Sequence, residues 1–320
     1  MKIWNLIIEN KKYVITAGIA VFLTAVLLSF VPQKIATIKI DAGSTPKQVA
    51  KILKKENIIT SENIFLTLVW LTGTEKNFQT GIYKFSNRMN EIVILYNIVK
   101  GRSYKIKVTV PEGYTSKDIA ELLERKGICS EKLFLEVVNA RKLEGYLFPE
   151  TYFLIPESPE EYVASILNSE FEKKFTRRFL DKAKDLKMTR EQIIILASII
   201  EKEAKDEKER PLISAVFHNR LKKGWHLESC ATVMYAIGEH RNHLTLKDTK
   251  ISSPFNTYLH PGLPPAPICN PGIASIKAAL YPVETEDMFF VADGSGTHKF
   301  SKYFEEHSLQ KGNIRNSRKK

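Results

Sequence analysis

The residue with the strongest claim to chemistry is Glu201, which follows an uncharged run that begins at Ile193 and holds a single hydroxyl. Thr189 and Gln192 have the spacing of a capping box, so we expect a helix to start near Arg190. A helix that is apolar on every side is buried in a protein core. Glu201 is therefore predicted to lie where a buried helix leaves the core.

Two small side chains, Ala197 and Ser198, share a helical face with Glu201 and leave room beside it. A carboxyl group in apolar surroundings is harder to ionise, so the pKa of Glu201 should rise, as a general acid at neutral pH requires. The alternative is that Glu201 only begins the solvated end of the helix, with Lys205 as its partner one turn on. The residue pattern alone leaves both interpretations open.

Other recognisable chemistry is absent from the sequence. It contains no phosphate loop, no Gly-x-Gly-x-x-Gly, no His-Glu-x-x-His and no Gly-x-Ser-x-Gly. His226 and Cys230 have an i, i+4 spacing without an obvious third ligand nearby, so we expect neither a metal nor another cofactor. The cysteines (Cys129, Cys230 and Cys269) are odd in number and include no Cys-x-x-Cys pair, which argues against a disulfide framework.

The N-terminus has the pattern of a retained membrane anchor. Residues 13–31 carry no charge, and a run of about 19 residues is close to the length that crosses a bilayer. Lysines precede this run, so the positive-inside rule places residues 1–12 in the cytoplasm and the remainder outside. A cleaved signal peptide is the alternative, but the end of the run offers no small-x-small cleavage site. The sequence thus predicts a single-pass membrane protein with an extracytoplasmic C-terminal part.

The net charge of +12 also bears on function. A strongly basic chain is often a nucleic-acid binder. A chain that faces away from the cytoplasm meets anionic lipid headgroups and cell-wall polymers instead, and a solvated, lysine-rich surface would explain much of the excess. We therefore expect no nucleic acid among the partners.

Residues 35–138 contain a repeated pattern at an offset of 70 residues. Ile40-Asp-Ala-Gly43-Ser-Thr45 in the first copy matches Val110-Pro-Glu-Gly113-Tyr-Thr115 in the second. Each copy is expected to be a strand, a glycine turn, an amphipathic helix capped by threonine and the start of a second helix. Further strands are expected at 81–86 and 104–110, so the pattern is that of duplicated small α+β units.

Proline and glycine dominate a long loop at residues 252–272, whose length and aromatic content argue for an ordered, functional segment. A helix to about Leu280 is expected after this loop, followed by a strand at 287–292. Asp293-Gly-Ser-Gly then has the composition of a turn into a return strand. The last ten residues, 311–320, have the composition of a frayed basic tail.

Six short motifs occur in a fixed order along the chain. They are Leu196-Ala-Ser-Ile-Ile-Glu201-Lys-Glu203, Val216-Phe-His-Asn219-Arg220-Leu221, Asn256-Thr-Tyr258, Gly262-Leu-Pro-Pro265, Asn270-Pro-Gly272 and Phe290-Val-Ala-Asp293-Gly294. This ordered set resembles the endolytic murein transglycosylases, the YceG-like family. Each motif is weak alone, but the set is highly specific, and the match runs from about Ile35 to His307. The segment Glu144-Gly-Tyr-Leu-Phe-Pro-Glu-Thr-Tyr152 is similar to the aromatic-Pro-acid-Thr-aromatic segment of the family.

The resemblance implies an α+β fold that follows the N-terminal transmembrane helix. Residues 36–104 would form a small module similar to LysM peptidoglycan-binding domains, and residues 105–310 the catalytic domain with its buried central helix. The essential glutamate of the family aligns with Glu201 and not with Glu203. Many relatives carry Asp-Pro where this chain has Cys230-Ala231, so no role of that pair is transferred to this chain.

The implied reaction cuts nascent peptidoglycan strands internally, between N-acetylmuramic acid and N-acetylglucosamine. Protonated Glu201 would protonate the linking oxygen, and its carboxylate would then take the proton of the muramyl 6-hydroxyl, which attacks its own anomeric carbon. The product is a 1,6-anhydro end, so the enzyme would be a lyase without a cofactor. A muramidase, which needs a second carboxylate, and a non-catalytic wall-binding or scaffold protein remain as alternatives.

Beyond Glu201, we expect Glu150, Asn256 and Tyr258 to line the glycan cleft, with a loop-stabilising hydrogen bond as the alternative role of each. The resemblance implies peptidoglycan strands as the substrate and penicillin-binding proteins of the wall-synthesis machinery as partners. It also implies a bacterial inner membrane as the location, with the protein crossing it once.

Overall fold

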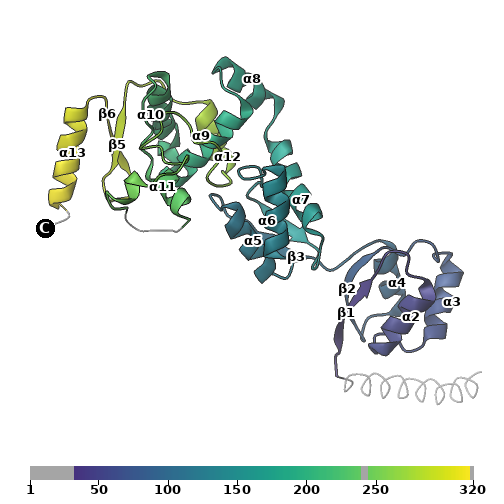
Figure 1. Cartoon of the computed structure of the whole chain (residues 1–320). Helices are drawn as coiled ribbons and strands as arrows, with labels where there is room; N and C mark the ends of the chain where they lie inside the picture. The colour runs from purple at the N-terminus through teal and green to yellow at the C-terminus, as the bar shows by residue number, and fades with distance from the viewer. Residues whose placement is uncertain (1–31, 239–243, 318–320) are drawn as a thin grey trace, which may run out of the picture. The chain divides into compact units, whose positions relative to one another are not determined.

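The computed structural model of the chain describes residues 32–238 and 244–317. The chain divides between Tyr104 and Lys105 into two compact units (Figure 1). Within the described ranges, each unit combines helices with two-stranded antiparallel sheets. The α+β part of the fold prediction is therefore confirmed.

The transmembrane part of the fold prediction must be corrected. The expected membrane helix, residues 13–31, lies outside the described residues. Among the helices that are described, none has the combined length and apolar character that crossing a bilayer requires. The longest of them, Glu160–Lys174, has 15 residues, whereas a span needs about 20 mostly apolar ones. The single-pass inner-membrane location that rested on this helix is not supported.

The first unit, described over residues 32–104, places helices beside a two-stranded sheet (Figure 1). Its elements are β1 (Ile35–Ile40), α2 (Pro46–Lys55), α3 (Glu62–Thr72), β2 (Gly81–Ser86) and α4 (Glu91–Val99). β1 pairs antiparallel with β2, with Ile35 opposite Ser86, and the residues of β1 alternate between exposed and buried. Their buried side chains join those of α2, α3 and α4 in one apolar core.

The second unit begins with the same order of elements. They are β3 (Ile106–Thr109), α5 (Ser116–Arg125), α6 (Glu131–Arg141) and β4 (Thr151–Leu154). β3 pairs antiparallel with β4, as β1 does with β2. Thr45 and Thr115 begin α2 and α5 with matching capping boxes, and the turn glycines, Gly43 and Gly113, have φ angles of 77° and 76°. The internal duplication expected from the sequence is confirmed.

The remainder of the second unit is built around one buried helix. Its helices are α7 (Glu160–Lys174), α8 (Arg177–Asp185), α9 (Arg190–Glu203), α10 (Arg210–Lys222), α11 (Cys230–Ile237) and α12 (Ile273–Leu280). Every residue of α9 from Ile193 to Ile200 is buried, and α8, α10, α11 and α12 pack against it. The Thr189 hydroxyl accepts the Gln192 N–H at 3.1 Å and the Gln192 side chain accepts the Thr189 N–H at 2.8 Å. The predicted capping box therefore fixes the start of the helix.

The C-terminal part of the described chain is a hairpin followed by a helix. β5 (Phe289–Ala292) pairs antiparallel with β6 (His298–Ser301), which confirms the predicted turn at Asp293. α13 (Phe304–Ser317) is helical through residues 311–317, where the composition suggested a frayed tail. The ring of Phe304 packs at 5.8 Å on that of Phe289, a tertiary contact that anchors the helix and that composition does not reveal.

Candidate active site

The carboxyl group of Glu201 is held at both of its oxygens. Glu201 lies in the last turn of α9, and its side chain is only 6% exposed. Oε1 accepts a hydrogen bond from Nη2 of Arg210 at 3.1 Å, and Oε2 accepts the backbone N–H of Gly272 at 2.9 Å. The stem of the side chain thus leaves an apolar helix, as predicted, but its head is paired with a cation and a peptide group.

The room beside Glu201 is filled by a segment from far along the chain. The Ser198 hydroxyl accepts the Ile268 N–H at 3.0 Å, and the Cys269 thiol donates to the Ser198 carbonyl at 3.3 Å. The small side chains on this face of α9 therefore allow the 268–272 segment to approach closely. This approach brings the N–H of Gly272 to the carboxylate.

Asn270, which is fully buried, ties the same segment to the second copy of the duplicated unit. Its side chain accepts the Leu147 N–H at 2.8 Å and donates to the Tyr114 carbonyl at 3.0 Å and to Glu144 at 3.2 Å. Its backbone donates to Tyr114 at 2.8 Å and accepts from Gly113 at 3.0 Å. The glycine turn of the second copy is thereby fixed next to the end of α9.

Glu112, which the sequence analysis did not single out, lies in this turn and completes what we call the Glu201 cluster (Glu112, Glu201, Arg210 and Gly272). Its Oε2 is 3.8 Å from Nη2 of Arg210, the nitrogen that also contacts Glu201. Its carboxyl group lies over the Cα of Gly272, where an added Cβ would be 1.8 Å from Oε1. Burial, and then the charge of Glu201, raises the pKa of Glu112. The only sequence signal was its position in the repeat, opposite Ala42.

A second buried carboxyl group, that of Glu144, accepts a hydrogen bond from Asn270, two residues before Gly272 of the cluster. Its two oxygens accept the Ser116 N–H at 3.1 Å each, and one also accepts from Asn270. Burial nevertheless outweighs these hydrogen bonds and raises the pKa of Glu144 to about 7. Glu144 therefore takes up a proton on folding at mildly acidic pH.

This proton uptake makes stability fall as the pH rises from the ordinary carboxyl range to about 7, because the folded state binds more protons there than the unfolded state. We expect the wild type to lose roughly 2 to 3 kcal/mol more unfolding free energy between pH 5 and pH 8 than a Glu144→Gln variant does. Urea unfolding of both proteins at the two pH values measures this difference. Parallel pH dependences would contradict the assignment.

A cavity of about 600 Å³ lies at the opposite end of α9 from Glu201. Its lining includes Glu191, His218 and the Gly262–Pro265 segment, but no member of the Glu201 cluster. Nε2 of His218 contacts the Ala279 carbonyl at 2.8 Å, and burial lowers the pKa of this ring. We therefore place the candidate chemistry at the Glu201 cluster and not in this cavity.

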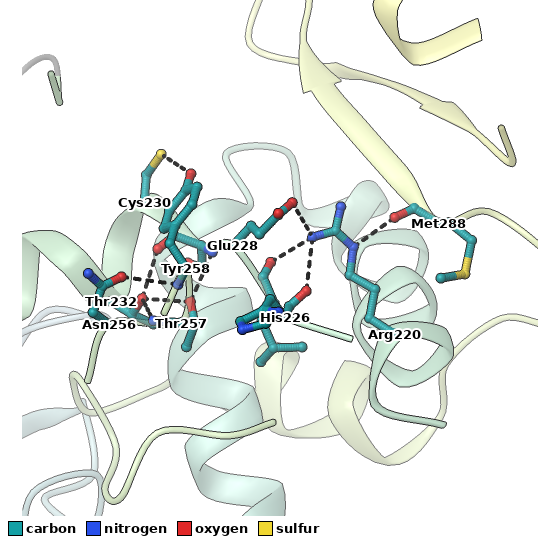
Figure 2. A network of polar contacts seen from close by, with 11 residues as sticks. Arg220, His226, Glu228, Cys230, Thr232, Asn256, Thr257, Tyr258 and Met288 are labelled. Atoms are coloured by element: carbon teal, nitrogen blue, oxygen red, sulfur yellow. Dashed lines mark hydrogen bonds and ion pairs between the residues drawn. The ribbon is translucent and has the colours of Figure 1, made fainter. Parts of the chain in front are cut away.

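Two residues predicted to line the cleft, Asn256 and Tyr258, belong to a separate polar network (Figure 2). Asn256 is fully buried; its amide donates to the carbonyls of Thr249 at 3.0 Å and Ile251 at 2.8 Å, and its oxygen accepts the Tyr258 N–H at 3.0 Å. These are the loop-stabilising contacts that formed the alternative interpretation. The Tyr258 hydroxyl lies 3.2 Å from the Cys230 thiol.

Glu150, the third residue predicted to line the cleft, is partly exposed just before β4. Its Oε2 is 3.8 Å from Nζ of Lys174, and its Oε1 accepts the Thr151 N–H at 3.0 Å. Among the hydrogen bonds and ion pairs of the described residues, none joins Glu150, Asn256 or Tyr258 to the Glu201 cluster. The structure brings Glu201 together with Glu112 and Arg210 instead.

Comparison with known proteins shows the family of this chain. The model of the YceG-like family matches residues 38–312. The chain belongs to the YceG-like family. The resemblance inferred from the ordered motifs is thus confirmed.

Relatives within the family are similar over most of this chain. The endolytic murein transglycosylase of Bacillus subtilis is 33% identical over 301 residues, which cover 86% of this chain and 83% of that protein. The endolytic murein transglycosylase of Streptococcus pneumoniae D39 is 26% identical over 82% of this chain and 55% of its own length. A crystal structure of a YceG-like protein from Listeria monocytogenes matches with a TM-score of 0.57 and 31% identity, over 87% of this chain and 99% of that one.

The YceG-like motif around Arg220 is structural in this chain. Nε of Arg220 donates to the Met288 carbonyl at 2.8 Å, and Nη1 donates to the Leu227 carbonyl at 2.9 Å and to Glu228 at 3.2 Å (Figure 2). The side chain is 8% exposed, and its guanidinium donors join α10 both to the segment that follows it and to Met288, which is distant in sequence. This motif supports the site without belonging to the Glu201 cluster.

The departure from the YceG-like pattern at Cys230-Ala231 lies at the start of α11, beside Glu203. The Ser229 hydroxyl donates to Glu203 at 2.5 Å, and the Ala231 N–H reaches the same oxygen at 3.5 Å. Glu203 therefore caps the start of α11, whereas Glu201 turns to Arg210 and Gly272. The two glutamates of the Leu196–Glu203 motif therefore form hydrogen bonds with different parts of the structure.

Proposed function

We propose that this chain is an endolytic murein transglycosylase, a lyase that cuts peptidoglycan strands internally, with Glu201 as its single general acid and base. Membership of the YceG-like family, and similarity over most of the chain to proteins named for that activity, support the activity. The observation that carries the assignment of Glu201 is its placement. Its side chain is 6% exposed at the end of a buried helix, and both carboxyl oxygens are held, beside the half-exposed Glu112.

In the proposed reaction, protonated Glu201 donates its proton to the oxygen between N-acetylmuramic acid and N-acetylglucosamine, and the bond from that oxygen to the muramyl anomeric carbon breaks. The carboxylate then removes the proton of the muramyl 6-hydroxyl, whose oxygen bonds to the same anomeric carbon. The Glu201 proton is restored and no water is consumed. Arg210 and the N–H of Gly272 orient the carboxyl group and stabilise the carboxylate between the two proton transfers.

Hydrolysis by a muramidase is the second candidate, because Glu112 supplies a second carboxylate at the site. Glycosidases that add water use two carboxyl groups on either side of the scissile bond. Glu112 and Glu201 contact the same guanidinium nitrogen, at 3.8 Å and 3.1 Å. Their closeness fits a shared role on one side better than an arrangement across a sugar ring.

Mass spectrometry of glycan strands incubated with the wild-type protein separates the candidates. We expect 1,6-anhydro-muramyl ends, which are lighter by one water than the reducing ends that a muramidase makes. Reducing ends alone would favour hydrolysis. Strands that stay uncut would favour the non-catalytic wall-binding account.

Residues 36–104 are proposed as a glycan-binding module similar to LysM domains, and residues 105–310 as the catalytic domain. The compact β1-α2-α3-β2 arrangement with its own apolar core supports the first assignment. The position of the Glu201 cluster supports the second. Penicillin-binding proteins stay a prediction about partners, which rests on the resemblance to a family linked with wall synthesis.

A further inference from the structure

The turn that carries Glu112 occurs twice in the chain, and only one copy carries a carboxylate. Glu112 and Gly113 in the second copy correspond to Ala42 and Gly43 in the first. The two glycines have φ angles within one degree of each other, and both turns lead into helices with threonine capping boxes. Because alanine serves the same turn in the first copy, the backbone geometry does not require a glutamate at residue 112.

The side chain of Glu112 is instead directed into the Glu201 cluster. Its carboxyl group covers Gly272 so closely that a methyl group on that residue would overlap it. It shares Nη2 of Arg210 with Glu201, and the turn beneath it is fixed by Lys202, whose Nζ donates to the Gly113 carbonyl at 3.0 Å. The Glu112 side chain is 46% exposed, whereas that of Glu201 is 6% exposed.

The charged groups around Glu201 affect how readily its carboxyl group ionises. A guanidinium beside a lone carboxyl group favours the ionised carboxylate, which is unsuitable for a resting general acid. Two carboxyl groups beside one guanidinium cannot both ionise without leaving an excess negative charge. Glu207, 3.6 Å from Nη1 of Arg210, adds a further negative charge from the solvent side, and Lys202, whose Nζ donates to the Gly113 carbonyl at 3.0 Å, adds a second positive charge. The carboxylates Glu112, Glu201 and Glu207 therefore outnumber the two cations, so Arg210 is not left beside a lone carboxyl group.

We propose that Glu112 is a positioning residue whose negative charge, placed beside Arg210, offsets the effect of the guanidinium on Glu201 and so keeps Glu201 able to protonate the glycan at neutral pH. This inference rests on the proposed function of Glu201 as the general acid. Glu112 need not touch the reacting atoms, because it acts through the charge that it places next to the acid. The second copy of the duplicated unit thus contributes to the active site a side chain that the first copy lacks.

The test is the pH dependence of kcat and kcat/KM for glycan cleavage by the full chain, with Glu112→Gln compared with the wild type between pH 4 and pH 9. Glutamine keeps the size of the side chain but removes its charge, so Arg210 then favours the ionised form of the acid. We expect the alkaline limb of the profile to move to lower pH by about one unit, with about tenfold lower kcat at pH 7.5 and unchanged 1,6-anhydro products.

Glu112→Ala gives the turn the residue that the first copy has, so this variant should fold. We expect it also to move the alkaline limb of the pH profile to lower pH. Glu121→Gln is the matched control, since Glu121 lies on the same copy and, among the residues that the structure describes, forms an ion pair only with exposed Lys117, at 3.9 Å. A profile of Glu112→Gln that matches the wild type, or an equal loss at every pH, would overturn the inference. Wild-type protein that leaves strands uncut would instead overturn the proposed function, and the inference with it.

Discussion

Replacement of Glu201 by glutamine should lower kcat for glycan cleavage by about 10³-fold while the protein stays folded. A carboxamide has no acidic proton to give to the linking oxygen and cannot remove the proton of the 6-hydroxyl. Its single oxygen can still accept the N–H of Gly272, now at 2.9 Å, so the side chain keeps its size and one of its two contacts, while the contact with Arg210 is lost. The rate of formation of 1,6-anhydro ends, followed by mass spectrometry, measures the loss.

The control for this variant is Glu203→Gln on the same helix. Glu203 is engaged with Ser229 and lies outside the Glu201 cluster, so its replacement should leave kcat close to the wild-type value. Thermal unfolding of both variants shows whether the fold is kept. If Glu201→Gln forms anhydro ends at the wild-type rate, the single-acid mechanism is wrong and another group must supply the proton.

Gly145→Ala is expected to destabilise the second unit by about 3 kcal/mol or more. Gly145 has a φ angle of 87°, and an added Cβ would lie 2.6 Å from Cβ and Cγ of Pro267 and 2.9 Å from Cγ2 of Ile194. The left-handed conformation alone costs a residue with a Cβ about 1 to 2 kcal/mol, and overpacking adds about 1 to 3 kcal/mol. Neither the proline ring nor the buried α9 side chain can move away without disturbing the core.

Gly127→Ala separates the two contributions. Gly127 has a φ angle of 66°, but an added Cβ would meet no atom within 4 Å. This variant should therefore lose only the conformational part, about 1 to 2 kcal/mol. Urea unfolding of both variants gives the comparison, and equal losses would show that the contact with Pro267 and Ile194 carries little of the effect.

Local features of the sequence were sufficient to predict the framework of the site. The capping box of Thr189 and Gln192 predicted the start of α9, because a cap is formed by residues three positions apart. The repeat predicted two similar units because the same turn and cap residues recur at a fixed offset. Each of these signals depends on neighbours along the chain, which a single sequence displays.

The partners of Glu201 could not be predicted in this way. Arg210 reaches the carboxylate only because the chain turns back after α9, and Glu112 reaches it only through the docking of Asn270 on the duplicated turn. The first contact crosses the turn after α9 and the second joins residues far apart in sequence, and periodicity carries no signal for either. Asn256 was selected for its place in a long loop, but that loop is ordered by the buried amide itself.

The Glu201 cluster also limits how early a newly synthesised chain can form a complete active site. Its members come from residues 112, 201, 210 and 272, so a growing polypeptide that stops before Gly272 lacks the amide that holds the acid. Closing such long loops is among the slower steps of folding. A chain truncated between Arg210 and Gly272 would keep Glu201 and its contact with Arg210 but would lack the amide that binds Oε2, and we expect it to be inactive.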